Sequence, residues 1–246
     1  MNRLDIKGDA RRIFDALVRG GVAVIPNDAG YALMGGSAAA VRRIFDAKER
    51  GEHKRNAMLC SIEMQRELHV LDARSQDMIE MITQDYDLTL GAVAPYRPDH
   101  PLLARLDEVT LAASTGNGTL GMLLNGGQLF EEVCRLSREA VLPVFGSSAN
   151  LSGTGPRFRV EDIPQELLDI ADVVIDYGLR KYHVYQRSAT ILRFGSGSVD
   201  VVRIGSCYEL IADVLRRHFG VKLPADPGRA VNASGHLEEF AFKTPA

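Results

Sequence analysis

The chain has 246 residues, of which 46% are hydrophobic and 25% are charged, and 23 glycines and 10 prolines are spread along it. This is the profile of a folded globular protein, and it excludes a disordered or fibrous chain. The formal net charge of -3 provides no global positive field, so any contact with RNA needs a local basic patch.

The N-terminal residues, MNRLDIKGDARR, lack the apolar stretch of a signal peptide, and no apolar run in the chain is long enough to cross a membrane. The cysteines Cys60, Cys134 and Cys207 form no C-x-x-C pair, and the 6 histidines are also dispersed. We therefore expect a cytoplasmic protein with no membrane partner, no metal-ligating residues and cysteines that fill the core.

In the first part of the chain, helical and strand patterns alternate. An apolar stripe at helical spacing predicts a helix between Asp9 and Gly20. Residues 22–26 (VAVIP) have the pattern of a strand buried on both faces, and residues 27–36 are expected to form a loop. Ser37 is a favourable N-cap for a second helix, whose last turn carries Lys48.

The rest of the chain predicts further helices and strands. The predicted strands are 57–61, 88–93, 109–114, 119–124, 142–146, 173–176, 189–194 and 199–204, and the predicted helices are 63–71, 75–83, 128–137 and 208–219. The strands between residues 88 and 124 have few helices between them, so parallel crossovers cannot join them all. We expect a single α/β domain with a mixed sheet over residues 1–222, followed by a loosely held tail, 223–246.

Three polar segments are candidates for a ligand site. Residues 147–153 (SSANLSG) follow a predicted buried strand, and in open α/β sheets the binding crevice lies beyond such strand ends. Lys48, Arg50, Lys54 and Arg55 form a basic cluster that suits a polyphosphate. Asp28 follows the first strand, where a carboxylate can receive an ammonium group or hold magnesium through water.

Each segment also has a purely structural interpretation. Ser, Asn and Gly favour turns, basic residues complement the C-terminal end of a helix dipole, and Asp28 can cap a turn. Neither G-x-x-x-x-G-K-[ST] nor G-x-G-x-x-G occurs, so the common nucleotide-binding motifs do not explain the segments. Composition and spacing alone leave both interpretations open.

Taken together and in this order, the segments resemble the YrdC-like family, whose best-known activity is threonylcarbamoyl-AMP synthesis. The resemblance covers roughly residues 10–206 and lies in GGVAVIPNDAGYAL, RRIFDAKERGEHKRNAMLC, PVFGSSANLSG and SATILRFGSGSVDVVRIG. These are similar to the family's first strand and loop, K-x-R pair, S-x-N loop, S-T strand and R-x-G strand end. The resemblance implies a twisted mixed sheet flanked by helices, with a concave basic cavity for ATP, L-threonine and bicarbonate.

The resemblance also implies roles for individual residues. Lys48 and Arg50 match the K-x-R pair and are the expected catalytic residues. The expected nucleotide-binding residues are Lys48, Arg50, Ser148, Asn150, Ser188 and Arg203, and the expected substrate-binding residues are Asp28, Tyr31 and Thr190. Mg²⁺ would accompany ATP, and a tRNA or downstream tRNA-modification proteins would be partners.

The sequence departs from the family pattern in several places. Asn27 and Ala29 replace threonines, and Ala32 replaces a glycine. Leu123 or Leu124 stands where a strand arginine is expected, and the W-P-G-P-L-T segment has no clear counterpart. These changes affect nucleotide and amino-acid contacts alike.

Three functions follow from these matches and departures. The leading hypothesis is synthesis of threonylcarbamoyl-AMP from ATP, L-threonine and bicarbonate, with release of pyrophosphate, for threonylcarbamoyladenosine formation in tRNA. One alternative is a non-catalytic RNA- or nucleotide-binding relative, and the other is a related carbamoyl or adenylyl transfer to a different small acceptor. The retained K-x-R and S-x-N residues favour an enzyme, whereas the missing strand arginine favours a binding module.

Overall fold

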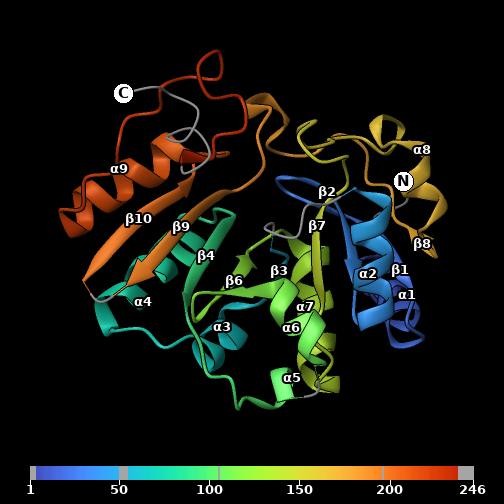
Figure 1. Cartoon of the computed structure of the whole chain (residues 1–246). Helices are drawn as coiled ribbons and strands as arrows, with labels where there is room; N and C mark the ends of the chain where they lie inside the picture. The colour runs from blue at the N-terminus through green and yellow to red at the C-terminus, as the bar shows by residue number, and fades with distance from the viewer. Residues whose placement is uncertain (1–3, 50–54, 105, 196, 238–246) are drawn as a thin grey trace.

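The computed structural model describes residues 4–49, 55–104, 106–195 and 197–237. Within this part of the chain the strands form one mixed sheet in the order β10-β9-β4-β6-β3-β7-β2-β1-β8, and a short β5 pairs with β6 (Figure 1). The strands are β1 (Val22–Asn27), β2 (Gly30–Gly35), β3 (Ala57–Cys60), β4 (Leu90–Pro95), β5 (Thr115–Gly116), β6 (Thr119–Leu124), β7 (Phe145–Ser148), β8 (Val173–Val174), β9 (Thr190–Gly195) and β10 (Ser198–Arg203). The predicted fold class, a single mixed sheet flanked by helices, is confirmed.

Side-chain caps determine where many of the helices begin. The helices are α1 (Ile6–Val18), α2 (Ala38–Ala47), α3 (Ile62–Leu68), α4 (Ala73–Glu80), α5 (Pro101–Ala104), α6 (Glu108–Ser114), α7 (Gln128–Ala140), α8 (Gln165–Asp169) and α9 (Tyr208–Phe219), and a π-helical turn (Met81–Asp85) continues α4. The side chains that accept a backbone N–H in the first turn of a helix are those of Asp5, Ser37, Ser61, Asp72 and Asp107. These are the residue types that satisfy the exposed N–H groups of a helix start. None of the helices in the described residues is long and apolar enough to cross a membrane.

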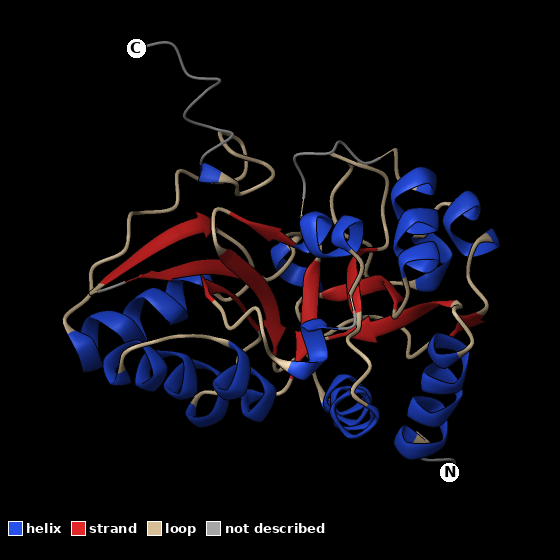
Figure 2. Cartoon of the chain, turned by 60° about the horizontal axis from the view of Figure 1, so that its bottom comes forward, coloured by secondary structure: helices blue, strands red, loops and turns tan. Residues whose placement is uncertain are grey.

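The two ends of the sheet are covered differently (Figure 2). At the β1–β2 end, helices lie on both sides: Ala23 and Met34 belong to the core that includes α1, whereas Val24 and Leu33 pack with α2 and α8. At the β10–β9–β4 end, helices lie chiefly on one side (Figure 2). The second end therefore leaves one side of the sheet less covered.

Burial along β6 and β9 shows which side chains lie on that less covered side. Residues 121 and 123 of β6 and residues 191 and 193 of β9 are half-buried, whereas the residues between them are buried. Val93 of β4 pairs with Gly121 on one side and with Arg193 on the other. Directly paired residues point to the same side of a sheet. We call this side the half-exposed face, and it carries Val93, Gly121, Leu123, Ile191 and Arg193.

Two sequence-based assignments were wrong, and one predicted strand has shifted bounds. Residues 27–36 were expected to form a loop but contain β2. The side chains of Tyr31 and Leu33 are buried on one side of the sheet, and those of Ala32 and Met34 are buried on the other. The predicted strand 109–114 is α6, because Asp107 accepts the N–H groups of residues 109 and 110 and starts a helix. The strand predicted at 142–146 is β7, which runs from Phe145 to Ser148.

The described part of the C-terminal tail contacts the sheet and α9. The Tyr208 hydroxyl donates to the Pro224 carbonyl oxygen at 2.6 Å. The buried Arg187 donates to the Asp226 carboxylate at 2.6 Å and to the Asn232 carbonyl oxygen at 2.8 Å. The N–H of Ile204, directly after β10, donates to the Gly235 carbonyl oxygen at 2.8 Å. The tail thus lies beside the end of β10, and the domain boundary at residue 222 stays a prediction.

Glu131, in the first turn of α7, is a carboxyl group with a raised pKa. Burial, and then the negative charge of Glu63, raise the pKa of Glu131 to about 7, while an interaction with the Asn125 backbone N–H lowers it. The folded protein therefore holds a proton on Glu131 in a pH range where the unfolded chain has lost it. Stability from this group is fully present below its ordinary pKa of 4.5 and is lost as the pH rises towards about 7.

We predict that Glu131→Gln removes this pH dependence. Between pH 4.5 and 7 the free energy of unfolding of the wild type should fall by about 1–2 kcal/mol relative to that of the variant, less than full linkage implies because the group is partly solvated. Urea unfolding of both proteins across this pH range measures the difference. Glu132→Gln is the matched control, because Glu132 pairs with Arg135 and its pKa is lowered. An equal effect of the two substitutions would contradict the assignment.

Candidate functional site

Lys48 connects the end of α2 to the loop after β7. Its side chain is only 1% exposed. Its Nζ donates to the carbonyl oxygen of Ser148 and, at 2.6 Å, to that of Asn150. In return, the Ser152 hydroxyl donates to the Lys48 carbonyl oxygen at 3.2 Å. The ammonium group thus lies inside the loop that the sequence singled out.

The loop also carries hydrogen bonds of its own. The Ser148 hydroxyl donates to the Asn150 side-chain oxygen, and the Asn150 amide donates to the Leu151 carbonyl oxygen at 2.6 Å. Lys48, Ser148 and Asn150 are therefore brought together, as the K-x-R and S-x-N positions imply. Arg50, the other K-x-R residue, lies outside the described residues.

Among the residues that the structure describes, three buried side-chain oxygen atoms near this loop lack a hydrogen-bond partner: Asn56 Oδ1, Ser114 Oγ and Ser147 Oγ. The backbone N–H of Asn56 donates to the carbonyl oxygen of Ala113, which precedes Ser114 in the chain. Ala57 pairs with Gly146, so continuing this register by one residue places Asn56 opposite Ser147. Unsatisfied buried polar atoms are rare and costly, so hydrogen-bond donors of a ligand or water would be stabilised here. Ser147 belongs to the segment that the sequence singled out, whereas sequence reasoning missed Asn56 and Ser114, which only the folded chain brings beside it.

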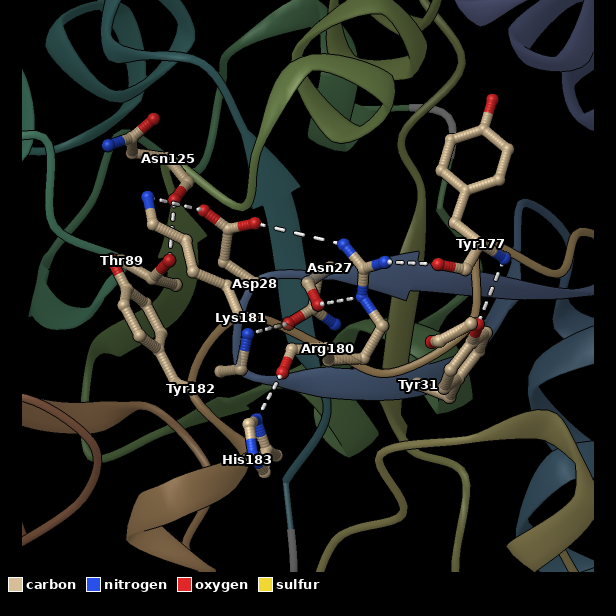
Figure 3. Close-up of polar contacts among 12 residues, drawn as sticks. Asn27, Asp28, Tyr31, Thr89, Asn125, Tyr177, Arg180, Lys181, Tyr182 and His183 are labelled. Atoms are coloured by element: carbon tan, nitrogen blue, oxygen red, sulfur yellow. Dashed lines mark hydrogen bonds and ion pairs between the residues drawn. The ribbon is translucent and has the colours of Figure 1, made fainter. Parts of the chain in front are cut away.

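Asp28 and Tyr31 lie at the tip of the β1–β2 hairpin and are held by the segment 176–183 (Figure 3). The Asp28 carboxylate lies 3.1 Å from Lys181 Nζ and 3.8 Å from an Arg180 nitrogen. The Tyr31 hydroxyl accepts the Tyr177 N–H at 3.0 Å. Both of these predicted substrate-binding residues are therefore engaged within the chain.

The protonation states of this cluster follow from burial and from the close charges. Burial raises the pKa of Tyr31 to about 12, and the Asp176 carboxylate 3.0 Å away also raises it, so the hydroxyl stays neutral. Burial acts to lower the pKa of Lys181, but the hydrogen bond and charge of Asp28 outweigh it and raise the pKa above the ordinary value. The Lys181 ammonium group is thus charged at neutral pH.

Thr190, Ser188 and Arg203 form a further group where β9 and β10 meet. The buried Thr190 hydroxyl donates to the Ser206 carbonyl oxygen at 2.9 Å and accepts the Gly205 N–H at 3.1 Å. The Arg203 guanidinium donates twice to the Ala189 carbonyl oxygen, at 3.0 and 2.8 Å. The Ser188 carbonyl oxygen accepts the Ser206 N–H at 2.8 Å. Side chains and backbone together keep this corner in place.

The predicted nucleotide-binding residues that the structure describes therefore form two groups, one at β7 and one at β9–β10. Strands β3, β6 and β4 lie between β7 and β9, so the groups are four strand spacings apart, about 19 Å along the sheet. The missing strand arginine falls between them. Of its two candidate positions, Leu124 is buried on the helix-covered side, so Leu123 is the residue on the half-exposed face.

Solved structures of other proteins share this fold. The hypothetical protein smu.1377c from Streptococcus mutans UA159 has a TM-score of 0.75 and 22% identity, covering 87% of this chain and 93% of its own. P. abyssi Sua5, complexed with L-threonine, has a TM-score of 0.68 and 18% identity over 91% of this chain. HypF, in a phosphate- and nucleotide-bound form, has a TM-score of 0.60 and 16% identity over 80% of this chain. This chain covers 61% of the Sua5 chain and 29% of the HypF chain.

Sequence comparisons give the family. No match was found among curated protein sequences. The family model for Sua5, YciO and YrdC, described as "Telomere recombination", matches residues 15–205. This match covers well over half of the chain and includes the segments built around Lys48, Ser148 and Arg203. The chain therefore belongs to the Sua5/YciO/YrdC family.

Proposed function

We propose that this protein makes threonylcarbamoyl-AMP from ATP, L-threonine and bicarbonate, for threonylcarbamoyladenosine formation in tRNA. Family membership supports this proposal, and the Sua5 structure with L-threonine indicates the substrate class. The observation that carries it is the buried Lys48 ammonium group inside the Ser148–Asn150 loop. That contact joins the two motifs expected to hold the nucleotide.

The reaction needs positioning more than it needs a nucleophilic side chain. The threonine amine combines with bicarbonate and loses water to give a carbamate. A carbamate oxygen then forms a bond to the α-phosphorus of ATP, and the bond between that phosphorus and the pyrophosphate oxygen breaks. Holding three reactants together and stabilising phosphate charge can supply most of the acceleration. Lys48 and Arg203 would contribute positive charge, and Ser148 hydrogen bonds.

Mg²⁺ would enter as part of the ATP substrate. Among the residues that the structure describes, no group of three or more His, Cys, Asp or Glu side chains is arranged to hold a metal ion. In the proposed reaction Mg²⁺ is carried by the phosphates, whose charge it partly neutralises.

We predict that purified protein with ATP and Mg²⁺ releases pyrophosphate only when threonine and bicarbonate are both present. The dependence on both follows because the attacking oxygen belongs to their product. A coupled pyrophosphate assay with each component omitted in turn is the measurement. Measurable ATP binding without pyrophosphate release in any mixture would instead identify a nucleotide-binding relative with no catalytic activity.

A second prediction separates ligand contact from loop structure at Ser148 and Asn150. Ser148→Ala removes one hydroxyl from the loop and should lower turnover roughly tenfold to a thousandfold with little change in melting temperature. Asn150→Ala removes both the acceptor for Ser148 and the bond to Leu151, so it should lower turnover and melting temperature together. Both quantities are measured on the same samples. A fully active Ser148→Ala would exclude Ser148 from the ligand site.

One observation favours a different acceptor from threonine. The Asp28 carboxylate, expected to receive the substrate ammonium group, is already paired with Lys181 at 3.1 Å. The similarity to HypF shows that the fold also occurs in a protein solved with phosphate and nucleotide. The second candidate function is therefore carbamoyl or adenylyl transfer to another small acceptor.

We predict that Asp28→Asn destabilises the protein without weakening threonine use. The substitution removes the ion pair that holds Lys181, so the melting temperature should fall, while KM for threonine should stay within about threefold of wild type. Asp87→Asn is the control, because exposed Asp87 lies 3.6 Å from the same lysine. An unchanged melting temperature with KM raised at least tenfold would assign Asp28 to the substrate.

A further inference from the structure

A cavity of about 360 Å³ lies between two loops that cross the tip of the β1–β2 hairpin. One wall comes from residues 156–162, after the S-x-N loop, and the other from residues 179–186, before β9. Sites for small molecules range from about 300 to 1,000 Å³, so a cavity of this size suits a compact ligand. No function was assigned to either wall from the sequence.

Hydrogen bonds hold the walls of the cavity in place. The Phe158 carbonyl oxygen accepts the N–H of Arg180 at 3.0 Å, which joins one wall to the other. The Arg157 carbonyl oxygen accepts the N–H of Tyr31 in β2 at 2.8 Å, which joins the first wall to the hairpin. A ligand would therefore find the walls already positioned, and binding would cost little ordering of the chain.

The Arg157 guanidinium group, which lines the cavity, has donors that the loop does not use. Nη1 donates to the Thr154 carbonyl oxygen at 3.1 Å and to the Gly155 carbonyl oxygen at 3.3 Å, and Nη2 donates to the Thr154 hydroxyl at 3.1 Å. These bonds occupy the edge between Nη1 and Nη2. The edge between Nε and Nη2 keeps two parallel N–H donors, the arrangement that binds a carboxylate. Among the described residues, Arg157 forms no ion pair with a carboxylate.

Asp162 brings the opposite charge to the same cavity. It ends the 3₁₀ turn Val160–Asp162, and its carboxylate forms no ion pair with a cation in the part of the chain that the structure describes. The neighbouring Arg159 and Glu161 do not line the cavity and pair with each other at 3.4 Å. The cavity thus carries one cation and one anion that are paired neither with each other nor with their charged neighbours.

The other lining residues offer apolar surface and a further acceptor. Phe158 and Leu179 are apolar, and Leu179 is 41% exposed, so an apolar group in the cavity would remove part of its surface from water. The His183 Nδ1–H donates to the Arg180 carbonyl oxygen at 3.0 Å (Figure 3). In the neutral ring this leaves Nε2 as a hydrogen-bond acceptor.

These groups favour a ligand that carries both charges. A ligand with a single charge meets one attractive and one repulsive group in the cavity, whereas a zwitterion meets two attractive ones. The structural alternative is that Arg157 only holds the loop through Thr154 and that Asp162 is simply solvated. The two interpretations predict different effects of the same substitutions.

We propose that this cavity binds a free α-amino acid with an apolar side chain. The ligand carboxylate would lie on the Arg157 guanidinium, its ammonium group on the Asp162 carboxylate, and its side chain against Phe158 and Leu179. The site is additional to the one proposed for threonine, and the inference does not depend on the proposed function.

Calorimetric titration with L-leucine and two analogues tests the ligand class. The analogues are 4-methylpentanoate, which lacks the ammonium group, and 3-methylbutylamine, which lacks the carboxylate. Leucine should bind with a Kd of about 1 mM or below, and each analogue at least about tenfold more weakly, because each loses one charge-assisted contact. Equal affinity for leucine and either analogue would overturn the proposal.

Substitutions in the cavity test its location. Arg157→Gln and Asp162→Asn should each weaken leucine binding about 10-fold or more. Arg159→Gln and Glu161→Gln are the matched controls, because they change the same charges next to the cavity, and both should bind leucine as the wild type does. Melting temperatures establish that the variants fold. Asp162→Asn removes no hydrogen bond or ion pair within the described residues, so it keeps the test valid if Arg157→Gln loosens the loop.

The remaining outcomes are also decisive. Absence of leucine binding to the wild type at about 10 mM would overturn the proposal. Leucine binding that neither Arg157→Gln nor Asp162→Asn weakens would overturn it too, since the ligand would then lie elsewhere. If Arg157→Gln lowers the melting temperature and leaves leucine affinity unchanged, Arg157 only holds the loop. Pyrophosphate release with threonine and bicarbonate tests the proposed function separately from all of these measurements.

Discussion

The removal of the Lys48 ammonium group from water is the constraint on which the candidate site depends. An isolated charge in a protein interior costs several kcal/mol unless hydrogen bonds replace its hydration. Here the carbonyl oxygens of Ser148 and Asn150 provide that replacement. The backbone after β7 must therefore turn its carbonyl groups towards α2. The same turn brings the side chain of Asn150 onto Ser148, so the geometry of the S-x-N loop follows from solvating one lysine.

A second constraint is the set of hydrogen bonds that holds the turn of the β1–β2 hairpin. Its tip contacts the β6–α7 loop through the hydrogen bond from the Asp28 N–H to the Gly126 carbonyl oxygen, 2.9 Å long. The segment 176–183 then fixes the tip from outside, through Lys181 on the Asp28 carboxylate and Arg180 on the Asn27 carbonyl oxygen. The pair of positions where the sequence departs from its family, Asn27 and Ala29, lies in this turn, where the Asn27 side chain accepts the Ala29 N–H at 2.9 Å. Local hydrogen bonding thus accounts for the asparagine at position 27, and the small side chain of Ala29 packs in the core.

Sequence reasoning identified most elements because their signals are local. Ser37 and the apolar stripe after it predicted α2 with Lys48 at its end, and α9 was predicted with the correct bounds. It failed where burial depends on distant partners. Residues 27–36 were predicted to form a loop, yet residues 30–35 form a strand between β1 and β7. The β-branched pattern of residues 109–114 was overridden by the cap at Asp107.

The candidate site was predictable only in part, for the same reason. The contact between Lys48 and the loop at 148–150 joins residues about one hundred positions apart, and the family pattern, not spacing, pointed to it. The unpartnered oxygens of Asn56, Ser114 and Ser147 and the position of Arg193 on the half-exposed face depend on strand register, which no sequence motif carries. Strand register also shows where the expected arginine is missing, because it places Leu123 on the half-exposed face. A leucine there leaves the centre of that face apolar, so the arginines of this half of the sheet stand on β9 and β10, as Arg193 and Arg203.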